Sequence, residues 1–448
     1  MYGIILINTI VVRFKVKMTV MQEQWQALDR RIQTWWDAEL HTAREQDLMD
    51  PKSHEIWSPT EEHRQRKMNK PQLPTLLYLP FPYITAGGGE AAFPEMYCWD
   101  TYFINRALAL HGRFEIIRHH ILNQLFLIER YGMVLTGNRT YYLGRSQTPL
   151  HSDSVLLYYE HTRDLDMISR AYPVLKQEYQ GYWLADHHQT RSGLATNRDL
   201  TELSAPAAAY DLDESLRPEL ASEAEVMDFT AIYAGDVRAC NPLQTNCVLV
   251  NYARNLAVMA GLIGRQKEAQ SWQQEADRRC ALIRELCWDE EQGFFFEYQF
   301  TTGRRLPYWS LAAYWTLWTD IATPQQVDRL VAQLPRFEYD HGLVQTLEKY
   351  PSPHPEFVHL QWDFPSGWPT FQILICEALI RRGYSDIARR IAQKYLRLQL
   401  DLYQSTGKLW EKYNVIEGNL NLPVERYPAV PLHGWSCTSI AYLGRLLF

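Results

Sequence analysis

One carboxyl group stands out as a candidate general acid because of its apolar neighbours. Asp228 lies in the segment SLRPELASEAEVMDFTAIY (215–233), between Met227 and Phe229. Apolar surroundings favour the neutral form of a carboxyl group, and a carboxyl that keeps its proton near neutral pH can donate it. The same segment carries Arg217, Glu219, Glu223 and Glu225. We expect Glu223 and Glu225 to lie on a solvated acidic face.

Tryptophan and aspartate occur together in LQWDFPSGWPTF (360–371), which has neither a helical nor a strand period. Pro365 and Gly367 mark it as an irregular segment. Trp362 and Asp363, with Gln361 before them, could pack in the core or could line a pocket. The segment GKLWEKYNVIEGNLNLPVERYPAVPLHGWS (407–436) adds further acidic and aromatic candidates, which are Glu411, Glu417, Glu425 and Trp435.

Two earlier segments gather aromatic rings and hydrogen-bonding groups at loops or helix entrances. In AGGGEAAFPEMYCWDTYF (86–103) the candidates are Phe93, Tyr97, Trp99 and Asp100. Asp100 could instead be a helix N-cap, a position that favours aspartate. In TGNRTYYLGRSQTP (136–149) the amide and guanidinium groups of Asn138, Arg145 and Gln147 suit sugar hydroxyl groups. A solvated loop is the alternative for this segment.

Composition narrows the class of protein. The chain has 448 residues, 46% hydrophobic and 22% charged, as in globular proteins. Its net charge of −7 argues against a nucleic-acid partner, because phosphate binding needs a basic surface. The 15 Trp and 27 Tyr exceed what is usual, and flat rings suit hydroxyl-bearing ligands.

The seven cysteines have no CxxC spacing and no matching histidine cluster, so we expect reduced core thiols in a cytosolic chain and no metal site. No GxGxxG or Walker pattern indicates a nucleotide cofactor. The apolar start MYGIILINTIVV is too short to cross a bilayer and lacks the features of a signal peptide. We expect residues 1–21 to be an extension, with Met18 or Met21 as alternative starts, and residues 22–448 to form one domain.

Helical patterns come in pairs along that domain, without a fixed repeat. We expect helices at 22–40, 102–111, 114–129, 153–162, 167–188, 244–263, 267–286, 309–319, 324–334, 368–381, 385–400 and 435–447, with short strands near 294–300 and 406–411. Paired helices form either a solenoid or a closed toroid, and a solenoid usually shows a sequence period. We therefore predict an all-α (α/α)6 barrel with a pocket at one end.

Four of these segments, taken in order, resemble the signatures of a known family. PEMYCWDTYF, NRTYYLGRSQTP, QWDFPSGWP and LWEKYNVIEG are similar to segments of the trehalases, glycoside hydrolase family 37. Related family 63, which includes hydrolases of glucosylglycerate and mannosylglycerate, shares the barrel. The resemblance covers roughly residues 75 to 445.

The resemblance implies an inverting glycosidase with Asp228 as general acid and Glu411, in the EKY motif, as general base. Such enzymes hold the two carboxyl groups about 6.5–9.5 Å apart, which leaves room for a water molecule. The positions that match sugar-contacting or pocket residues of the family are Phe93, Tyr97, Trp99, Asp100, Asn138, Arg145, Gln147, Arg217, Glu219, Gln361, Trp362, Asp363, Glu425 and Trp435. No metal or other cofactor is implied.

The chain departs from the family pattern at positions that bear on which group forms the second half of the substrate. Ala92 stands where trehalases carry an arginine, and NLNLPVERY replaces a glycine-rich run before the late glutamate. The favoured substrate is trehalose or a similar small α-glucoside. Glucosylglycerate, mannosylglycerate, glucosylglycerol or sucrose is the alternative. A catalytically silent sugar-binding relative and a helical interaction scaffold are further alternatives.

Overall fold

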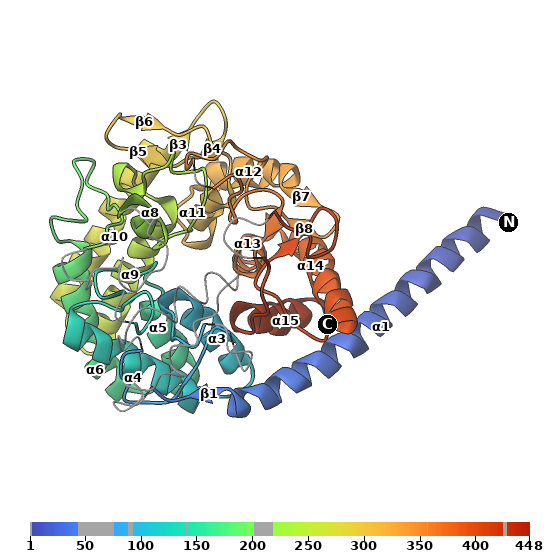
Figure 1. The fold of residues 1–448 in the computed structure, drawn as a ribbon, viewed down its shortest axis with the longest axis horizontal. Helices are drawn as coiled ribbons and strands as arrows, with labels where there is room; N and C mark the ends of the chain where they lie inside the picture. Colours follow the sequence, from blue (N-terminus) through green and yellow to red (C-terminus); the bar gives the residue numbers. More distant parts are fainter. Residues whose placement is uncertain are drawn as a thin grey trace, which may run out of the picture.

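The computed structural model describes residues 2–43, 76–87, 93–139, 142–200, 218–355, 357–423 and 428–448, with side chains from residue 18 onward. Within these ranges the chain forms a closed (α/α)6 barrel, which confirms the predicted fold (Figure 1). Six helices make the inner ring in the described part: α3 (Cys98–Leu110), α5 (His151–Thr162), α9 (Leu243–Leu262), α11 (Trp315–Trp318), α13 (Pro369–Arg381) and α15 (Gly434–Leu447). Each packs against the next, and α15 closes the ring on α3.

The outer ring alternates with the inner one along the chain. It consists of α1 (Tyr2–Ala38), α4 (Phe114–Tyr131), α6 (Leu165–Glu178), α10 (Gln266–Cys287), α12 (Pro324–Gln333) and α14 (Ser385–Thr406). Most inner helices are buried on nearly every side, as in α3, where every residue before Leu110 is buried. The inner helix α5 is the exception among them, with five buried residues of twelve. Outer helices are amphipathic, as in α14, whose buried positions repeat at helical spacing.

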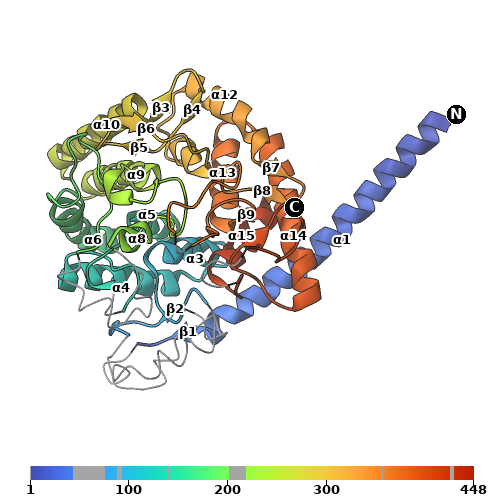
Figure 2. The same ribbon diagram turned by 45° about the horizontal axis from the view of Figure 1, so that its top comes forward.

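Helix α1 begins far from the barrel and docks onto it in its second half, along α14 and α15 (Figures 1 and 2). Met21, Leu28, Ile32 and Trp36 are buried at spacings of seven, four and four residues. Trp25 donates to the Ile440 carbonyl oxygen at 3.0 Å. The helix therefore runs through the expected boundary at residue 21 without a break.

Short elements fill the loops between the helices. A π-helical turn, η5 (Tyr179–Trp183), extends α6 across the range predicted as one helix. The remaining helical elements of the described ranges are one short α-helix and three 3-10 turns: α8 (Pro218–Glu223), η6 (Val237–Ala239), η7 (Leu311–Tyr314) and η8 (Leu334–Arg336). Helix α8 escaped the sequence analysis because six residues carry too little periodicity.

The strands are two residues long and pair antiparallel within the described ranges: β1 (Leu40–His41) with β2 (Tyr83–Ile84), β3 (Trp288–Asp289) with β4 (Phe294–Phe295), β5 (Tyr298–Gln299) with β6 (Arg304–Arg305), β7 (Glu338–Tyr339) with β8 (Gly342–Leu343), and β9 (Ser366–Gly367) with β10 (Tyr413–Asn414). The strand predicted near 294–300 corresponds to β4 and β5. The strand predicted at 406–411 is wrong, because α14 continues to Thr406 and β10 starts only at Tyr413.

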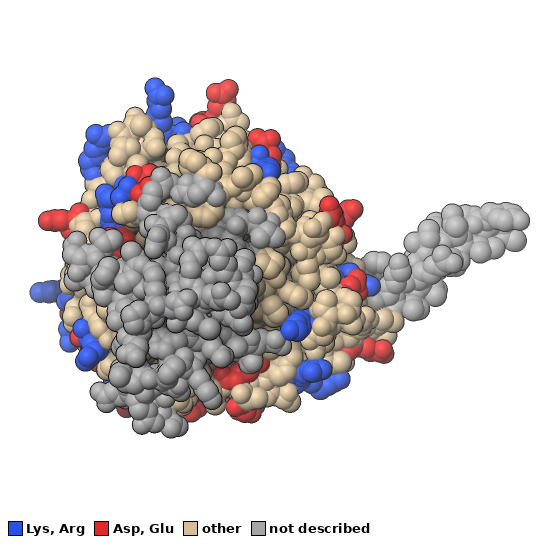
Figure 3. Space-filling view, viewed as in Figure 1, with Lys and Arg blue, Asp and Glu red and all other residues tan. Residues whose placement is uncertain are grey.

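All seven cysteines are buried and free of disulfide bonds. Among the described residues, no helix combines the length and apolar character that crossing a lipid bilayer requires. Basic and acidic side chains alternate around the rim of the face shown in Figure 3, which fits the modest net charge of −7.

Candidate active site

The sequence-predicted residues gather where the chain enters the inner helices. Asp100 lies in the first turn of α3, and Gln147 precedes α5 by four residues. Asp228 lies on the loop that leads to α9, and Trp362 lies on the loop that leads to α13. Glu411 lies on the segment that leads to α15. Loops that enter parallel neighbouring helices meet at one end of a barrel, so chain topology brings these distant residues together.

Asp228 is held by the indole of Trp362. The Nε1–H of Trp362 donates to Asp228 Oδ1 at 2.8 Å. Asp228 is partly exposed, whereas its neighbours Met227 and Phe229 are each 1% exposed. Phe229 has a φ of 62°, in the left-handed region that non-glycine residues rarely adopt. Its carbonyl oxygen accepts from the Trp362 amide at 3.3 Å, so two hydrogen bonds join Asp228 and its neighbour to Trp362.

Two buried carboxyl groups clamp the chain just after Asp228. Asp363 Oδ1 accepts from the Thr230 hydroxyl at 2.7 Å, and Asp363 Oδ2 accepts from the Ala231 amide at 3.2 Å. Glu223 Oε1 accepts from the Thr230 amide at 2.7 Å, and its other oxygen lies 3.1 Å from His354 Nε2. Burial raises the pKa of Asp363 to about 7 and also raises the pKa of Glu223. Asp363 therefore fixes the loop that carries Asp228.

The expectation that Glu223 and Glu225 form a solvated face is wrong. Their exposed fractions are 0% and 1%. Glu225 accepts from the Thr136 hydroxyl at 2.7 Å and lies 3.4 Å from Arg145 Nε. Burial raises the pKa of Glu225 well above its usual range, and the Arg145 guanidinium opposes that rise. The sequence alone suggested that Glu223 and Glu225 are solvated, because the residues that bury them lie on distant segments of the chain.

Arg145 is 2% exposed and is enclosed by protein groups. Besides Glu225, it donates to the Ala221 carbonyl oxygen at 3.2 Å and lies 3.8 Å from Asp199 Oδ2. Its guanidinium stacks over the ring of Tyr142 at 4.9 Å. The side chain predicted to bind sugar hydroxyl groups thus ties α8 to the loop before α5.

Glu411 is buried, with a relative exposure of 4%, and forms an ion pair with its own neighbour. Lys412 Nζ lies 2.9 Å from Glu411 Oε2 and 2.8 Å from Gln361 Oε1. The indole of Trp435 donates to the Glu411 carbonyl oxygen at 2.9 Å. Burial and the negative charge of Glu411 raise the pKa of Asp100 to about 8, so Asp100 keeps its proton at neutral pH.

A cluster of four indoles joins the acid and base segments. Trp362 and Trp368 stack with ring centroids 3.6 Å apart and planes 8° from parallel. Trp99 lies 5.9 Å from Trp362 and 5.9 Å from Trp435, and Trp368 lies 5.8 Å from Trp435. Asp228 contacts one end of this tryptophan cluster through Trp362. Glu411 contacts the other through Trp435.

The ladder between β9 and β10 fixes these two segments relative to each other. Gly367 pairs with Tyr413, and Ser366 pairs with Asn414. A Cβ atom on Gly367 would lie 2.3 Å from Val415 Cγ1, so this close approach requires glycine. The irregular stretch noted at 360–371 thus combines the hydrogen-bond donor to Asp228 with the strand that pairs beside Glu411.

The other predicted residues take different positions. Tyr97 and Phe93 are partly exposed and in edge contact, and Gln147 Oε1 accepts from the Trp99 amide at 3.3 Å. Asn138 is fully buried and binds the Met96 amide and the Leu77 carbonyl oxygen, so the prediction that it contacts a sugar does not fit its surroundings. Glu219 lies 3.5 Å from Arg238. Arg217, Glu425 and Ala92 lie outside the described residues.

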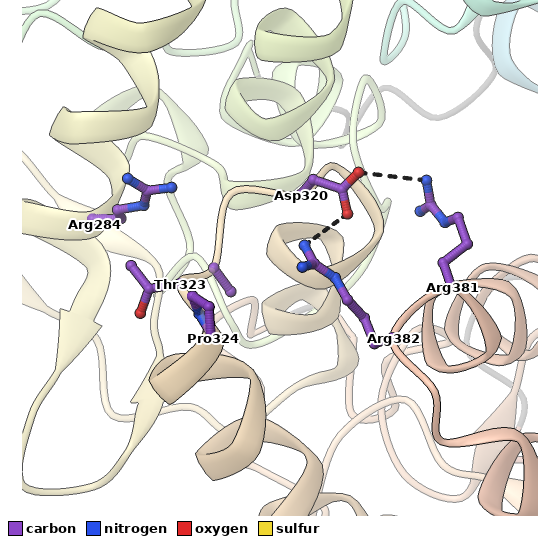
Figure 4. A pocket seen from close by; sticks show the side chains of 7 residues that line it. Arg284, Asp320, Thr323, Pro324, Arg381 and Arg382 are labelled. Atoms are coloured by element: carbon purple, nitrogen blue, oxygen red, sulfur yellow. Dashed lines mark hydrogen bonds and ion pairs between the residues drawn. The ribbon is translucent and has the colours of Figure 1, made fainter.

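A hollow of about 530 Å³ on the barrel wall contains none of the predicted site residues (Figure 4). It is lined by Arg284, Asp320, Ala322, Thr323, Pro324, Arg381 and Arg382. Asp320 forms ion pairs with Arg381 and Arg382. Arg284 donates to the Ile321 carbonyl oxygen at 2.6 Å, and Arg381 donates to that of Trp318. These arginines bind the loop after α11, which accounts for them structurally.

Asp228, Asp100 and Glu411 bring carboxyl groups, which are the groups that acid–base chemistry uses, to the neighbourhood of the four indoles. In the part of the chain that the structure describes, no three His, Cys, Asp or Glu side chains come together as metal ligands would. Lys412 and Trp368 are functional candidates that the sequence analysis did not single out. Their signal was position alone, since Lys412 directly follows Glu411 and Trp368 follows Trp362 by six residues within the segment 360–371.

Comparison with known proteins identifies the family of the chain. The family model described as Trehalase matches residues 12–227 and 228–443. The chain belongs to the trehalase family. A probable trehalase of Eremothecium gossypii is 29% identical over 397 residues, which cover 75% of this chain and 52% of the relative. The cytosolic neutral trehalase of Kluyveromyces lactis is 26% identical, with coverages of 75% and 51%. This trehalase-family chain thus spans about half the length of both relatives.

Solved structures of trehalase-family and related enzymes share the barrel. Neutral trehalase Nth1 from Saccharomyces cerevisiae superposes with a TM-score of 0.68 at 25% identity, covering 82% of this chain and 74% of that one. A family 63 mannosylglycerate hydrolase from Thermus thermophilus gives a TM-score of 0.57 at 17% identity, with coverages of 81% and 95%. The second likeness concerns the fold alone.

Proposed function

We propose that this trehalase-family chain is an inverting glycoside hydrolase that cleaves trehalose, with Asp228 as general acid and Glu411 as general base. The observation that carries the proposal is the tryptophan cluster, which contacts Asp228 at one end and the Glu411 segment at the other. Membership of the trehalase family supports the same reaction.

In the proposed reaction, Asp228 protonates the bridging oxygen while Glu411 removes a proton from the attacking water. We expect the two carboxyl groups to be about 6.5–9.5 Å apart, the range of inverting enzymes. A separation near 5 Å would favour a retaining mechanism instead. Asp363, Glu223 and Thr230 act on the acid indirectly, by holding the loop that carries Asp228.

For the sugar we propose contacts with Phe93, Tyr97, Trp99 and Trp435, whose rings suit the C–H face of a pyranose. Gln147 and the protonated Asp100 supply hydrogen-bonding groups at the same loops. Arg217 and Glu425 remain predicted contacts from the family resemblance. We also propose a cytoplasmic location, supported by relatives that are named cytosolic neutral trehalases.

Glucose release from trehalose, followed by proton NMR at early times, tests both activity and stereochemistry. Inversion at an α,α-linked disaccharide produces α- and β-glucose in equal amounts, whereas retention produces the α anomer alone at first. Asp228→Asn and Glu411→Gln should each lower kcat by roughly 10²- to 10⁴-fold in a protein that still unfolds cooperatively. Glu411→Gln should also lower the melting temperature, because it removes the buried ion pair with Lys412. Full activity in either variant would refute the assignment of that residue.

A smaller or acidic second half of the substrate is the alternative, favoured by Ala92 in place of the trehalase arginine. One structure that shares the barrel is named a mannosylglycerate hydrolase. A parallel assay on sucrose, glucosylglycerol, glucosylglycerate and mannosylglycerate compares these substrates directly. A higher kcat/KM for any of them than for trehalose would change the assigned substrate without changing the roles of the two carboxyl groups.

A further inference from the structure

Lys412 is a buried cation placed directly against the proposed base. Its ammonium group lies 2.9 Å from Glu411 Oε2, and the two side chains are 3% and 5% exposed. Opposite charges this close and this far from solvent interact strongly, and a carboxylate beside such a cation favours its ionised form. A general base must be ionised to accept a proton.

Gln361 holds Lys412 in this position. Its Oε1 accepts from Lys412 Nζ at 2.8 Å, and its carbonyl oxygen accepts from the Trp368 indole at 3.2 Å. Lys412 Nζ also lies 5.1 Å from the centre of the Trp368 ring, within the range of a cation–π contact. Gln361 is neutral, so it orients the ammonium group of Lys412 without neutralising the positive charge that acts on Glu411.

The ionisable groups around Glu411 affect the ionisation of its carboxyl group in opposite directions. Asp100, from the first turn of α3, faces Glu411 closely enough for the two charges to interact, and Asp228 lies at the other end of the tryptophan cluster. Both of these groups are acids, and a negative charge on either one, once it loses its proton, disfavours ionisation of Glu411. Lys412 supplies a positive charge on the same carboxylate.

We propose that Lys412 is a positioning residue for the general base, which fixes the orientation of the Glu411 carboxylate and favours its ionised form. Gln361, predicted from the sequence to bind substrate, orients Lys412 instead. The inference rests on the proposed hydrolase function, yet it concerns a property of Glu411 that can be measured in the resting protein.

The experiment compares Lys412→Met with Lys412→Arg in the full chain. With Lys412→Met, kcat on trehalose should fall at least about tenfold, and the acidic limb of the kcat/KM profile should move about 1 to 3 pH units higher. Arginine keeps the positive charge and should return the limb toward the wild-type position. In a Glu411→Gln background, Lys412→Met should cause no further loss, because the group that it positions is already absent.

A purely structural role would lower stability or kcat without moving the pH profile. The matched control is Lys176→Met, which removes a Lys–Glu pair of similar length, 2.6 Å to Glu268, on the outer helices. If Lys412→Met does not fold, Gln361→Leu provides a milder variant in which Lys412 keeps its charge but loses its second partner. It should shift the acidic limb in the same direction by a smaller amount.

Carbon-13 NMR of glutamate-labelled protein gives a readout independent of activity. The Glu411 carboxyl signal is the one missing in Glu411→Gln, and its titration midpoint should rise in Lys412→Met. A raised midpoint in Lys412→Met, together with a wild-type protein that releases no glucose, would uphold the pairing and refute the proposed function. An unchanged midpoint and an unchanged acidic limb in a folded, active Lys412→Met protein would refute the role of Lys412 alone.

Discussion

The indole of Trp362 donates a hydrogen bond to the carboxyl oxygen of Asp228 at 2.8 Å, across 134 positions of sequence. A tryptophan in a sugar-cleaving pocket is usually expected to stack on substrate. Here one face of its ring is covered by Trp368 and its edge holds the proposed acid. The residue therefore orients the proposed acid while it packs within the tryptophan cluster.

Trp362→Phe keeps an aromatic ring against Trp368 and removes the hydrogen bond. We expect kcat to fall roughly 10- to 100-fold because a misplaced acid protonates its target poorly, with a smaller change in KM. Trp318→Phe is the matched control, since it deletes an indole–carboxyl bond of 3.0 Å to Glu377 between two helices. Steady-state kinetics with trehalose would distinguish the two variants. Equal losses of kcat in both would contradict an orienting role for Trp362.

Asp100 should limit activity and stability at high pH. In the folded protein the pKa of Asp100 is about 8, so this carboxyl group keeps its proton up to about that pH, whereas an unperturbed aspartate loses its proton near pH 3.8. Between these values the unfolded chain binds fewer protons, so stability from this group falls as the pH rises. Asp100→Asn should raise the free energy of unfolding at pH 7, on the order of a few kcal/mol, and flatten this decline.

The same substitution has a kinetic signature. Above about pH 8 the ionised Asp100 adds a second negative charge beside Glu411, so we expect wild-type kcat to decline there. In Asp100→Asn that decline should be weaker, even if the overall rate is lower. Denaturation curves and kcat between pH 5 and 9.5 provide both measurements. An identical basic limb in the two proteins would show that Asp100 does not control it.

Thr230→Val tests the clamp behind the acid. Its hydroxyl donates to Asp363 at 2.7 Å, and a buried carboxyl group that loses a donor costs about 1–3 kcal/mol. Because this clamp holds the Asp228 loop, kcat should fall with stability. Thr316→Val, which deletes a buried hydroxyl bonded to the Ala313 carbonyl oxygen in the helical wall, should lower stability alone. Chemical denaturation and kinetics on both variants separate the two effects.

Gly367→Ala tests the pairing of β9 with β10. The added methyl group would overlap Val415 and approach the Leu343 carbonyl oxygen to 3.0 Å. We expect a loss of roughly 1–3 kcal/mol in unfolding free energy, as for other overpacked sites, together with reduced kcat. Gly181→Ala serves as the control, because a Cβ there meets nothing within 4 Å. Comparable melting temperatures for the two variants would contradict the tight fit.

Sequence patterns were sufficient for the long helices, but neither for the short helix α8 nor for the polar contacts. The helix predicted at 114–129 corresponds to Phe114–Tyr131, since its apolar spacing is local information. Burial of Glu223 and Glu225 was missed because their partners His354 and Arg145 lie 131 and 80 positions away. The same reason explains why Asn138 was predicted to contact a sugar. Its side-chain amide binds the Met96 amide and the Leu77 carbonyl oxygen, which lie on distant segments of the chain.

The family signatures identified candidate site residues, which the periodicity of the sequence could not identify. They pointed to Asp228 and Glu411, but not to the partners that set the properties of these groups. Lys412 was visible only as part of a motif, and no sequence rule predicts that its ammonium group turns back onto the preceding residue rather than out to solvent. Such contacts depend on Gln361, which the fold delivers from 51 positions away.

The β9–β10 ladder holds the Trp362 loop and the Glu411 segment in a fixed register. The relative placement of the proposed acid and base therefore depends on two short strands that pair with each other. Under the proposed mechanism, this pair governs which anomer is released. Sequence changes elsewhere in the chain would then alter the preferred substrate and leave the anomer unchanged.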